Sequence, residues 1–452
     1  MIADKVLVNG TIVTPFGRYK GAIGIKDGKI AYISTDNPDI EAKERIDVQG
    51  KYILPGVIDA HIHFQDPGFT HREDFEHGTA ACAAGGITTA MSHPMNIPPI
   101  VDTASYNINK EAYENRGVVD YCIHGGGITE KRDAVEDLWL NTGATCVKMF
   151  MCFSVKEFPF VGDDVMFDIL QTLARHDGLA IIHCENQPLI KLMEQRLKAE
   201  GRKDPLAYNL SRPEMVEIEA IRRVIFLAGQ ANAKVLVVHV STKEGLEDIH
   251  RASERGVRIW AETCPHFLTF VREDADALGP FLKFSPVMRD EENRRKLWEL
   301  LDRGYVHTIG SDHCPFDKAE KEEGADDIWK APNGIPGLEV MLNVLLDGVN
   351  KGLTSLERIV RITSYNPSQL YGIYPKKGVI QPGSDADFVI VDMEKEKTFT
   401  EADRKSKCTW SPYFGRTFKG WPVMTLLRGE VIAKDGVVLG KPGYGQYIPR
   451  AK

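Results

Sequence analysis

The stretch GATCVKMFM, residues 143–151, is a short apolar run that follows a glycine and contains a single lysine, Lys148. Short runs that are rich in apolar residues and bounded by glycine are typical of buried β-strands. Lysine is rarely buried, because its ammonium group loses hydration and then needs a partner. The stretch therefore predicts a buried strand, and it raises the question of what accommodates Lys148 at the end of that strand.

Similar apolar runs recur through the middle of the chain, each followed by a loop and then a helical pattern. They are VIDAH (57–61), GITTAMS (86–92), VVDYCIH (118–124), ATCVKMF (144–150), LAIIHC (179–184), KVLVVHV (234–240), VRIWAET (257–263) and YVHTIGSDH (305–313). Amphipathic helix candidates, such as residues 214–230 and 293–304, lie between them. Eight strands that alternate with helices over about 250 residues predict an α/β fold of the (β/α)8 barrel type.

A doubly wound open sheet is the alternative for a chain in which strands and helices alternate. Such sheets usually bind nucleotides through a glycine-rich first turn. The sequence contains neither a GxGxxG nor a GxxxxGK[ST] motif. We therefore favour the barrel.

The two ends of the chain differ from the middle. Residues 1–55 consist of short apolar runs separated by NG and DG, which are hairpin signals, and residues 383–395 and 423–440 repeat this texture. We expect one small composite β-sandwich domain, built from residues 1–55 and 373–452, beside a barrel of residues 56–372. Two separate β appendages are the alternative.

Composition and charge limit the classes of partner. The net charge of -8 and the pI near 6.0 argue against nucleic acid or an anionic membrane. No apolar run approaches the ~20 residues of a membrane helix, and the N-terminal segment lacks the pattern of a signal peptide. The eight cysteines are scattered without a CxxC pair, which indicates buried free thiols rather than disulfides or a zinc–cysteine site. We expect a cytoplasmic protein.

Candidate metal ligands stand at the carboxyl ends of the predicted strands, where a barrel gathers its active site. They are His61, His63, Lys148, His183, His239 and Asp312. Imidazole and carboxylate are the usual ligands of Zn²⁺ and other first-row divalent metals. A lone histidine at a strand end is more often structural, but four strands that end in ligand types predict a metal site. His61 and His63 occupy alternate positions, so their side chains should point the same way.

The sequence resembles the cyclic amidohydrolases, which are the allantoinases, the hydantoinases with dihydropyrimidinases, and the dihydroorotases of the amidohydrolase superfamily. The similar segments are VIDAHIHFQDPG, GITTAMSHPMNIPP, VKMF, IIHCEN, SRPEMVEIEAIRR, VVHVST, ETCPHFL, FSPVMRD, IGSDHCPF and SPYFGRTFKG. They follow one another in order from about residue 50 to residue 440. The resemblance implies a (β/α)8 barrel with a composite β-sandwich and two divalent metal ions per chain.

The resemblance also implies an answer for Lys148. In this family the lysine after the fourth strand is carboxylated by CO₂, and the resulting carbamate bridges the two metals. An ammonium group would repel two dications, whereas a carbamate offers them two oxygens and a negative charge. A lysine that reaches the rim to pair with an acid is the alternative.

Carried over by position, one ion would be held by His61, His63, Lys148 and Asp312, and the other by Lys148, His183 and His239. Zn²⁺ is the expected metal, with Mn, Co or Fe as alternatives. The implied mechanism is attack of a metal-bridging hydroxide on a ring amide carbonyl. Asp312 would take the proton of the nucleophile and deliver it to the leaving nitrogen.

Several neighbours of the candidate ligands have expected roles outside the metal site itself. For His93, His266 and His313 we expect structural or supporting roles. Glu185 follows His183 directly, so it could orient that imidazole or cap the next helix. None of these residues is needed as a ligand.

Substrate class depends on a few positions that differ within the family. Dihydroorotases have an arginine where this chain has Gln65, and hydantoinases have a tyrosine where it has Phe153. HFQDPG and SPYFGRTFKG are more similar to allantoinases, whereas SDHCPF and KAPNGIPGLE are more similar to hydantoinases. The substrate contacts implied are Asn96, Ser285, Asn333 and Gln65. We favour hydrolysis of allantoin to allantoate, with a hydantoinase or dihydropyrimidinase as the alternative and a dihydroorotase less favoured.

Two other classes of function stay open at this point. One is a binding protein that kept the fold and lost its metals, although the intact ligand set argues against it. The other is a mononuclear deaminase of the same superfamily, but such enzymes generally lack the bridging lysine. We expect a small cyclic ureide or amide as the partner, and a homotetramer or another homo-oligomer as the assembly.

Overall fold

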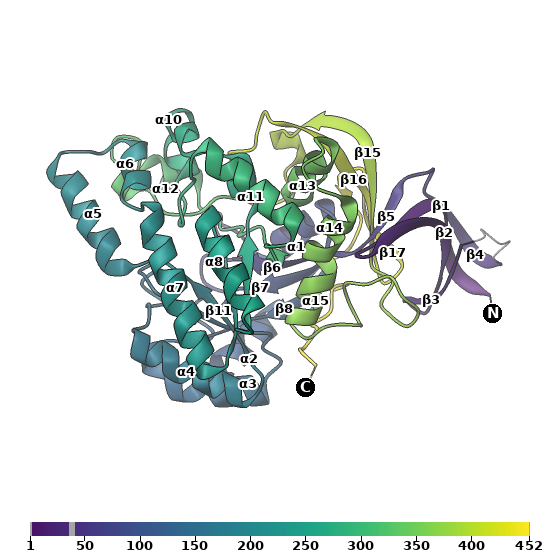
Figure 1. The fold of residues 1–452 in the computed structure, drawn as a ribbon. Helices are drawn as coiled ribbons and strands as arrows, with labels where there is room; N and C mark the ends of the chain where they lie inside the picture. The colour runs from purple at the N-terminus through teal and green to yellow at the C-terminus, as the bar shows by residue number, and fades with distance from the viewer. Residues whose placement is uncertain (1, 36–40, 452) are drawn as a thin grey trace.

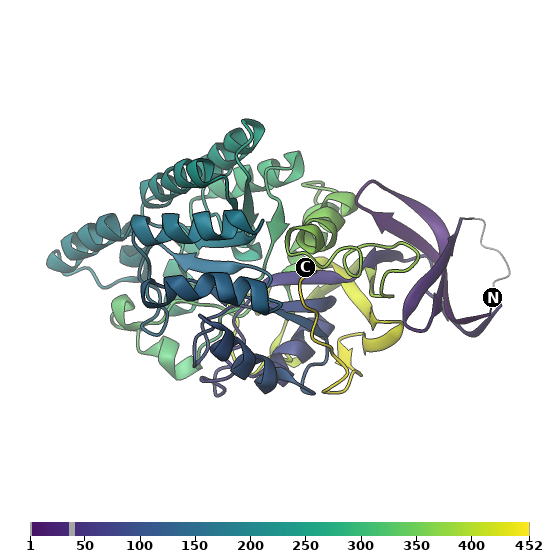
Figure 2. The same ribbon diagram turned by 90° about the horizontal axis from the view of Figure 1, so that it is seen from below.

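The structure is a computed structural model that describes residues 2–35 and 41–451. Figure 1 shows a barrel wrapped by helices beside a β-sheet region in which purple N-terminal strands lie next to yellow-green C-terminal ones. The view from below in Figure 2 shows the same arrangement, with helices around the barrel strands and the sheet region to one side.

The barrel is a closed ring of parallel strands. Its strands are β6 (Val57–Ile62), β7 (Ile87–Ser92), β8 (Asp120–Ile123), β9 (Gly125–Gly126), β10 (Val147–Phe150), β11 (Leu179–His183), β12 (Lys234–Val237), β13 (Ile259–Thr263) and β14 (Thr308–Ile309). β6, β7 and β8 pair in that order, and β9 to β14 pair in chain order. β8 and β9 are two parts of one strand, separated only by His124.

One contact closes the ring between its first and last strands. The His63 N–H donates to the His313 carbonyl at 2.8 Å, and Ile62 forms a parallel bridge with His313. The described strands therefore fill eight positions of a closed barrel, and the predicted fold class is confirmed.

Helices cover the outside of the barrel. They are α1 (Phe75–Ala84), α2 (Thr103–Tyr113), α3 (Val135–Asn141), α4 (Asp163–Arg175), α5 (Gln187–Ala199), α6 (Pro205–Leu210), α7 (Glu214–Ala231), α8 (Lys243–Glu254), α9 (Pro265–Thr269), α10 (Ala275–Leu278), α11 (Glu291–Arg303), α12 (Lys318–Glu322), α13 (Met341–Asn350), α14 (Leu356–Val360) and α15 (Asn366–Leu370). The helices predicted at 214–230 and 293–304 are α7 and α11. The Asp290 side chain caps α11 by accepting from the Asn293 N–H, and Gly304 ends the helix at φ +92°.

Strands from both ends of the chain form one sheet. These are β1 (Ala3–Thr14), β2 (Gly17–Lys26), β3 (Lys29–Ser34), β4 (Ala42–Asp47), β5 (Tyr52–Pro55), β15 (Phe388–Thr398), β16 (Thr417–Leu427), β17 (Glu430–Lys434) and β18 (Val437–Val438). β5 pairs antiparallel with β15, which joins the two halves, and β4 pairs with β1. The sheet thus combines both ends, as the sequence predicts, rather than forming two appendages. The exact domain boundaries stay a prediction.

The turn signals in the sequence have two different outcomes. Asp27–Gly28 connects β2 to β3 and Asp435–Gly436 connects β17 to β18, each with positive φ at both residues, as expected for hairpins. The hairpin signal at Asn9–Gly10 is wrong, because β1 continues through it. Asn9 takes φ +58° and the register against β2 shifts there, so the pair forms a bulge within one strand.

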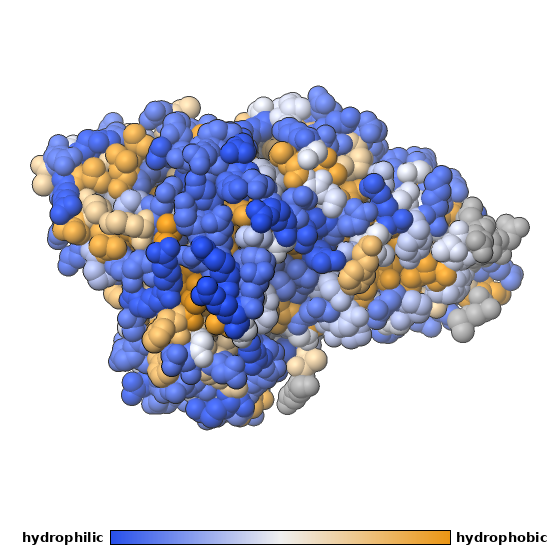
Figure 3. Space-filling view, viewed as in Figure 1, coloured by the Kyte–Doolittle hydropathy of each residue, from blue (hydrophilic) through white to orange (hydrophobic). Residues whose placement is uncertain are grey.

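Polar and charged side chains cover most of the face seen in Figure 3, with hydrophobic patches over the region of α5 and α6. Leu192 in α5 and Leu210 at the end of α6 are among the exposed apolar side chains. Among the described helices, none combines the length and the apolar character needed to cross a membrane. All eight cysteines lie in the described residues and are free thiols, as predicted.

A buried ionic cluster joins the barrel to the sheet. The Lys377 ammonium, 1% exposed, lies 2.5 Å from Asp120 of β8, 2.6 Å from Asp387 and 3.0 Å from Asp385. Arg428, which follows β16, forms a second ion pair with Asp120. Lys376 and Lys29, both partly exposed, also pair with Asp385, so the three buried carboxylates are balanced by cations from several segments.

We expect Lys377→Met to lower the free energy of unfolding by about 3–5 kcal/mol, because it leaves the buried Asp387 without a paired cation and removes one cation from Asp120 and Asp385. Urea-induced unfolding followed by circular dichroism measures this. The matched control is Lys376→Met, since Lys376 pairs with Asp385 from a side chain that is 46% exposed. That variant should change the free energy of unfolding by less than about 1 kcal/mol. Equal losses in the two variants would contradict the role of burial.

Candidate active site

The six candidate metal ligands all line one small cavity of about 40 Å³ in the barrel. His61 lies in β6, Lys148 in β10 and His183 at the end of β11, while His63, His239 and Asp312 directly follow strands or lie just beyond them. A water molecule occupies about 30 Å³ in the liquid, so this space suits ions and water rather than an organic molecule.

Three of the ligand atoms converge at one side of this cavity. The Nε2 atoms of His61 and His63 each lie 3.2 Å from the Oδ1 atom of Asp312. Two donors at about 2.0–2.2 Å from a shared tetrahedral ion stand about 3.4 Å apart, so these spacings fit metal ligation. The ligand set of two imidazoles and a carboxylate is one that Zn²⁺ and similar ions prefer.

A second pair of donors faces the same cavity. His183 Nδ1 and His239 Nε2 are 2.9 Å apart. Lys148 contributes its side chain to the cavity wall and is 1% exposed. The cavity is thus bordered by two groups of donors with a buried lysine.

Burial keeps these side chains in the forms that can bind metal. It lowers the pKa of His61 and His239 well below the usual range, and it lowers the pKa of His183 as well. The imidazoles are therefore neutral, and each has a lone pair available. Burial also lowers the pKa of the Lys148 ammonium to about 8, although Asp312 and Glu262 attract its charge.

Backbone conformation at the site departs from the strand geometry that the apolar runs suggest. His239 and Asp312 adopt φ +41° and +46°, and Gln65 adopts φ +61°. β12 ends at Val237 and β14 at Ile309, short of the predicted runs. Left-handed backbone costs free energy in residues other than glycine, and it is concentrated at functional sites.

Carboxylates hold two of the histidines from behind. His61 Nδ1 lies 2.6 Å from Glu262, and His183 Nε2 lies 2.9 Å from Glu185, which Arg212 pairs at 2.7 Å. Such partners fix the tautomer and orientation of a ligating imidazole. The residue that caps α5 is Asn186 rather than Glu185. Of the two predicted roles for Glu185, the structure therefore supports the one in which it orients the His183 imidazole.

Glu262 and Arg212 are supporting residues that the sequence interpretation missed. Glu262 is fully buried and lies in the apolar run VRIWAET. An acidic residue in an apolar strand indicates a buried polar contact, so the sequence does contain evidence for its role. Arg212 lies in the short turn between α6 and α7, and no pattern in the sequence indicates its contact with Glu185.

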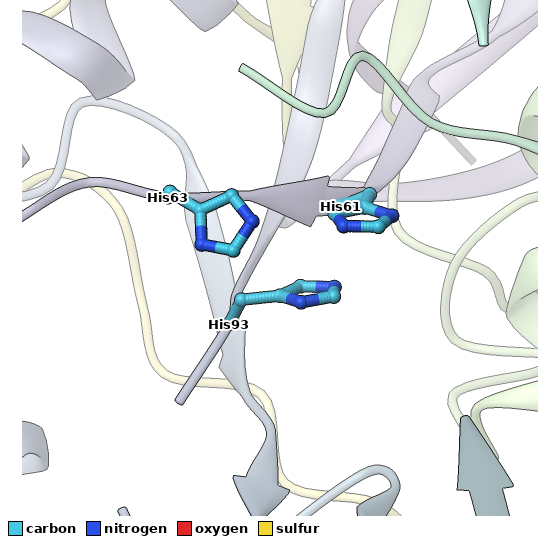
Figure 4. Close-up of side chains that lie close together, drawn as sticks. All are labelled: His61, His63 and His93. Carbon is cyan, nitrogen blue, oxygen red and sulfur yellow. The ribbon is translucent and has the colours of Figure 1, made fainter. Parts of the chain in front are cut away.

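His93 lies against the ligands without joining them. Figure 4 shows its ring beneath that of His61, and the two rings are stacked with centroids 3.8 Å apart and planes 7° apart. An imidazole binds metal in its own plane, so two parallel stacked rings cannot both direct a lone pair at one ion. His93 therefore acts as a platform for His61, in line with the predicted supporting role.

His266 and His313 contact residues outside the candidate ligand set. His313 Nε2 lies 3.2 Å from Glu73, and its Nδ1 accepts from the Gly337 N–H. The His266 ring is buried beside the rings of Phe267 and Phe284.

A larger cavity of about 580 Å³ shares wall residues with the metal-ligand cavity. His63, Met95 and Asn333 line both, so the two spaces adjoin each other. Gln65 lines the larger cavity and Ser285 the smaller one. The larger volume is that of a small-molecule site.

The structure does not bring Asn96, a predicted substrate contact, to these cavities. Its amide nitrogen donates to Asn109 Oδ1 at 2.8 Å and to the Tyr113 hydroxyl at 2.9 Å, and its neighbour Met95 lines the cavities instead. Both amide hydrogens are therefore used inside the fold. Phe153, the position that distinguishes hydantoinases, lines the larger cavity and is 55% exposed.

Comparison with known proteins places the chain in a family. The model of the amidohydrolase family matches residues 52–432. The chain is 38% identical over 450 residues to an L-hydantoinase of Paenarthrobacter aurescens, covering 99% of this chain and 98% of that protein. It is 33% identical over 455 residues to an allantoinase of Deinococcus radiodurans, covering both chains in full.

A solved structure agrees with the sequence matches. The L-hydantoinase (dihydropyrimidinase) from Arthrobacter aurescens superposes with a TM-score of 0.97 at 37% identity, covering 99% of this chain and 100% of that one. Fold, family model and full-length relatives thus coincide, and the chain belongs to the amidohydrolase family as an enzyme that hydrolyses carbon–nitrogen bonds.

Proposed function

We propose that this hydrolase of cyclic amides opens a five-membered cyclic ureide, a hydantoin ring, at one of its amide bonds. The observation that carries the proposal is the convergence of two donor groups on one small cavity that adjoins a cavity of about 580 Å³. Relatives named L-hydantoinase, D-hydantoinase and allantoinase support it, since allantoin is itself a hydantoin with a ureido substituent.

The donor set supports two divalent ions, for which Zn²⁺ is our choice. His61, His63 and Asp312 would hold one ion, His183 and His239 the other, and a carboxylated Lys148 would bridge them. Ions bound there would polarise the ring carbonyl and lower the pKa of a bound water from 15.7 towards ~7. A buried lysine with a pKa of about 8 has a neutral fraction near pH 7, which is the form that reacts with CO₂.

The side chains around the ring have complementary roles in the proposal. Asp312 takes a proton as water adds to the ring carbonyl, and it returns that proton to the ring nitrogen as the C–N bond breaks. The products are a carboxylate and an open-chain urea. Asn333 Oδ1 is buried without a hydrogen-bond partner among the described residues, so it can accept from a ring N–H. Ser285 Oγ donates to Glu185 at 2.7 Å, which leaves its lone pairs free to accept as well.

The wall of the larger cavity favours an apolar group at C5 of the ring. Charged and aromatic side chains share it, and the aromatic ones include Phe69, Phe153, Phe316 and Trp329. Both guanidinium groups in this wall are paired, Arg72 by Glu320 and Arg212 by Glu185. The aromatic part of the wall suits an alkyl or aryl substituent, and we place the C5 group against it.

Allantoin, which the sequence interpretation favours, stays as a second candidate because of one residue. Gln65 lines the cavity, and within the described residues the one contact of its side-chain amide is at 3.7 Å to the Cys314 thiol. That amide could therefore hydrogen-bond a ureido group.

We also propose a cytoplasmic homotetramer or other homo-oligomer. On α7, Met215 is 46% exposed and Phe226 is 64% exposed, and both border an open hollow along that helix. Exposed apolar patches of this kind often mark protein contacts.

A substrate panel tests the ring and its substituent. We expect hydrolysis of 5-alkyl and 5-aryl hydantoins to exceed that of allantoin by about tenfold in kcat/KM, which corresponds to a modest difference in pocket contacts. Dihydrouracil and dihydroorotate should be poorer substrates. Product formation, measured by chromatography, gives kcat/KM for each substrate. A preference for allantoin would favour the second candidate.

Asp312→Asn should fold normally and lose about 10²–10⁴-fold in kcat, because the amide cannot accept the proton. Circular dichroism checks the fold, and metal analysis by mass spectrometry separates lost ligation from lost proton transfer. Activity near that of the wild type would exclude the role assigned to Asp312.

Lys148→Met should reduce the metal content from about two ions per chain towards one or none, because it removes the bridging oxygens. Intact-protein mass spectrometry of the wild type under native conditions should show the added mass of one CO₂, which the variant lacks. An uncarboxylated wild type that still holds two metals would overturn the bridging role.

A further inference from the structure

Two buried lysines support the wall that carries the proposed imide contacts: Lys283 lines the larger cavity, and Lys321 lies behind it. Lys321 is fully buried and Lys283 is 6% exposed. In the described part of the chain, every hydrogen-bond acceptor of their ammonium groups is a backbone carbonyl oxygen. Burying a charged group is costly, so a pair of lysines with no carboxylate partner needs an explanation.

Lys321 holds the backbone on both sides of Asn333. Its Nζ donates to the carbonyl of Pro332 at 2.9 Å and to that of Gly334 at 3.1 Å. Those carbonyls belong to the residues before and after Asn333, so one ammonium fixes both flanking residues. The Asn333 side chain, whose Oδ1 atom has no hydrogen-bond partner among the described residues, therefore extends from a backbone that Lys321 holds in place.

Lys283 connects the same loop to the segment of Ser285. Its Nζ donates to the carbonyls of Ile328 at 2.8 Å and Ala331 at 2.5 Å. Its own carbonyl accepts from the Gly334 N–H at 3.1 Å and from the Lys321 ammonium at 3.2 Å. Lys283 precedes Ser285 by two residues, so these bonds tie the two imide-contacting segments together.

The loop has little freedom to take another path. A Cβ atom added to Gly334 would lie 2.3 Å from the Cys314 carbonyl oxygen, so the backbone passes directly against that residue. Residues 328–334 otherwise contain one short 3-10 turn, Ile328–Lys330. The loop position therefore depends on the two lysines and on this close approach.

We propose that Lys283 and Lys321 are positioning residues that set the distance between Asn333 and Ser285 to fit the imide of the substrate ring. The inference rests on the proposed function, because it takes these two side chains as the contacts to the ring. The lysines touch neither the candidate metal ligands nor the reacting bond, so they act on substrate affinity rather than on the chemical step.

Single substitutions test the two lysines against an exposed neighbour. In Lys321→Met and Lys283→Met the loop carbonyls lose their donors, so KM for the best hydantoin of the panel should rise about tenfold while kcat stays within about threefold. Metal content should equal that of the wild type. The matched control is Lys330→Met, on the same loop but exposed, which should leave KM unchanged. Unchanged KM in both lysine variants, or a fall in kcat alone, would overturn the proposal.

A double-mutant cycle tests whether Lys321 acts through Asn333. Asn333→Ala should raise KM by itself, and Lys321→Met should then add little, because the contact it positions is already gone. Lys321→Gln keeps two N–H donors and should give an intermediate KM, and it replaces Lys321→Met in the cycle if the latter does not fold. Additive effects on KM would contradict positioning through Asn333.

The same measurements separate this inference from the proposed function. If the metal-loaded wild type hydrolyses no hydantoin, the proposed function fails. If it does so and the lysine variants keep the KM of the wild type, only the positioning role fails.

Discussion

Closure of the parallel barrel is the constraint on which the site depends. The His63 N–H donates to the His313 carbonyl and so joins the first strand of the ring to the last. Asp312 directly precedes His313 in the chain, so this junction also brings the side chains of His63 and Asp312 together. His63 Nε2 lies 3.2 Å from Asp312 Oδ1, although the two residues are about 250 positions apart in sequence. An open sheet would have left these two strands at opposite edges. The donor group of His61, His63 and Asp312 is in this sense a consequence of ring closure.

The site places many polar groups where water cannot solvate them, and several of these groups have a specific protein partner. Glu262 and Glu185 accept hydrogen bonds behind two histidines, and Arg212 balances the charge of Glu185. The ammonium groups of the buried Lys283 and Lys321 are likewise hydrogen-bonded by carbonyl oxygens. Rigid partners of this kind keep side chains oriented before a substrate arrives, which is how preorganised sites favour a reaction.

Much of the fold and of the ligand set could be predicted from the sequence, because both depend on local patterns. Apolar runs alternate with amphipathic segments, and the ligand types stand where those runs stop. The remainder depends on contacts between distant residues. Asn96 is turned inward by Asn109 and Tyr113, and Asn9–Gly10 forms a bulge because β1 continues past it. Nor does any pattern show that Lys283 and Lys321 meet one loop, since their acceptors are backbone carbonyls that every residue has.

The shared sheet has a consequence for biosynthesis. β5 leaves the ribosome early, but β15, its hydrogen-bonded neighbour, follows about 330 residues later. At 5–20 residues per second, the unpaired edge of β5 waits for roughly 20–70 s while the barrel is translated. An exposed strand edge is a template for wrong pairing, so nascent chains of this protein are most vulnerable to aggregation in that interval. Loss of the C-terminal strands by premature termination would make that vulnerability permanent.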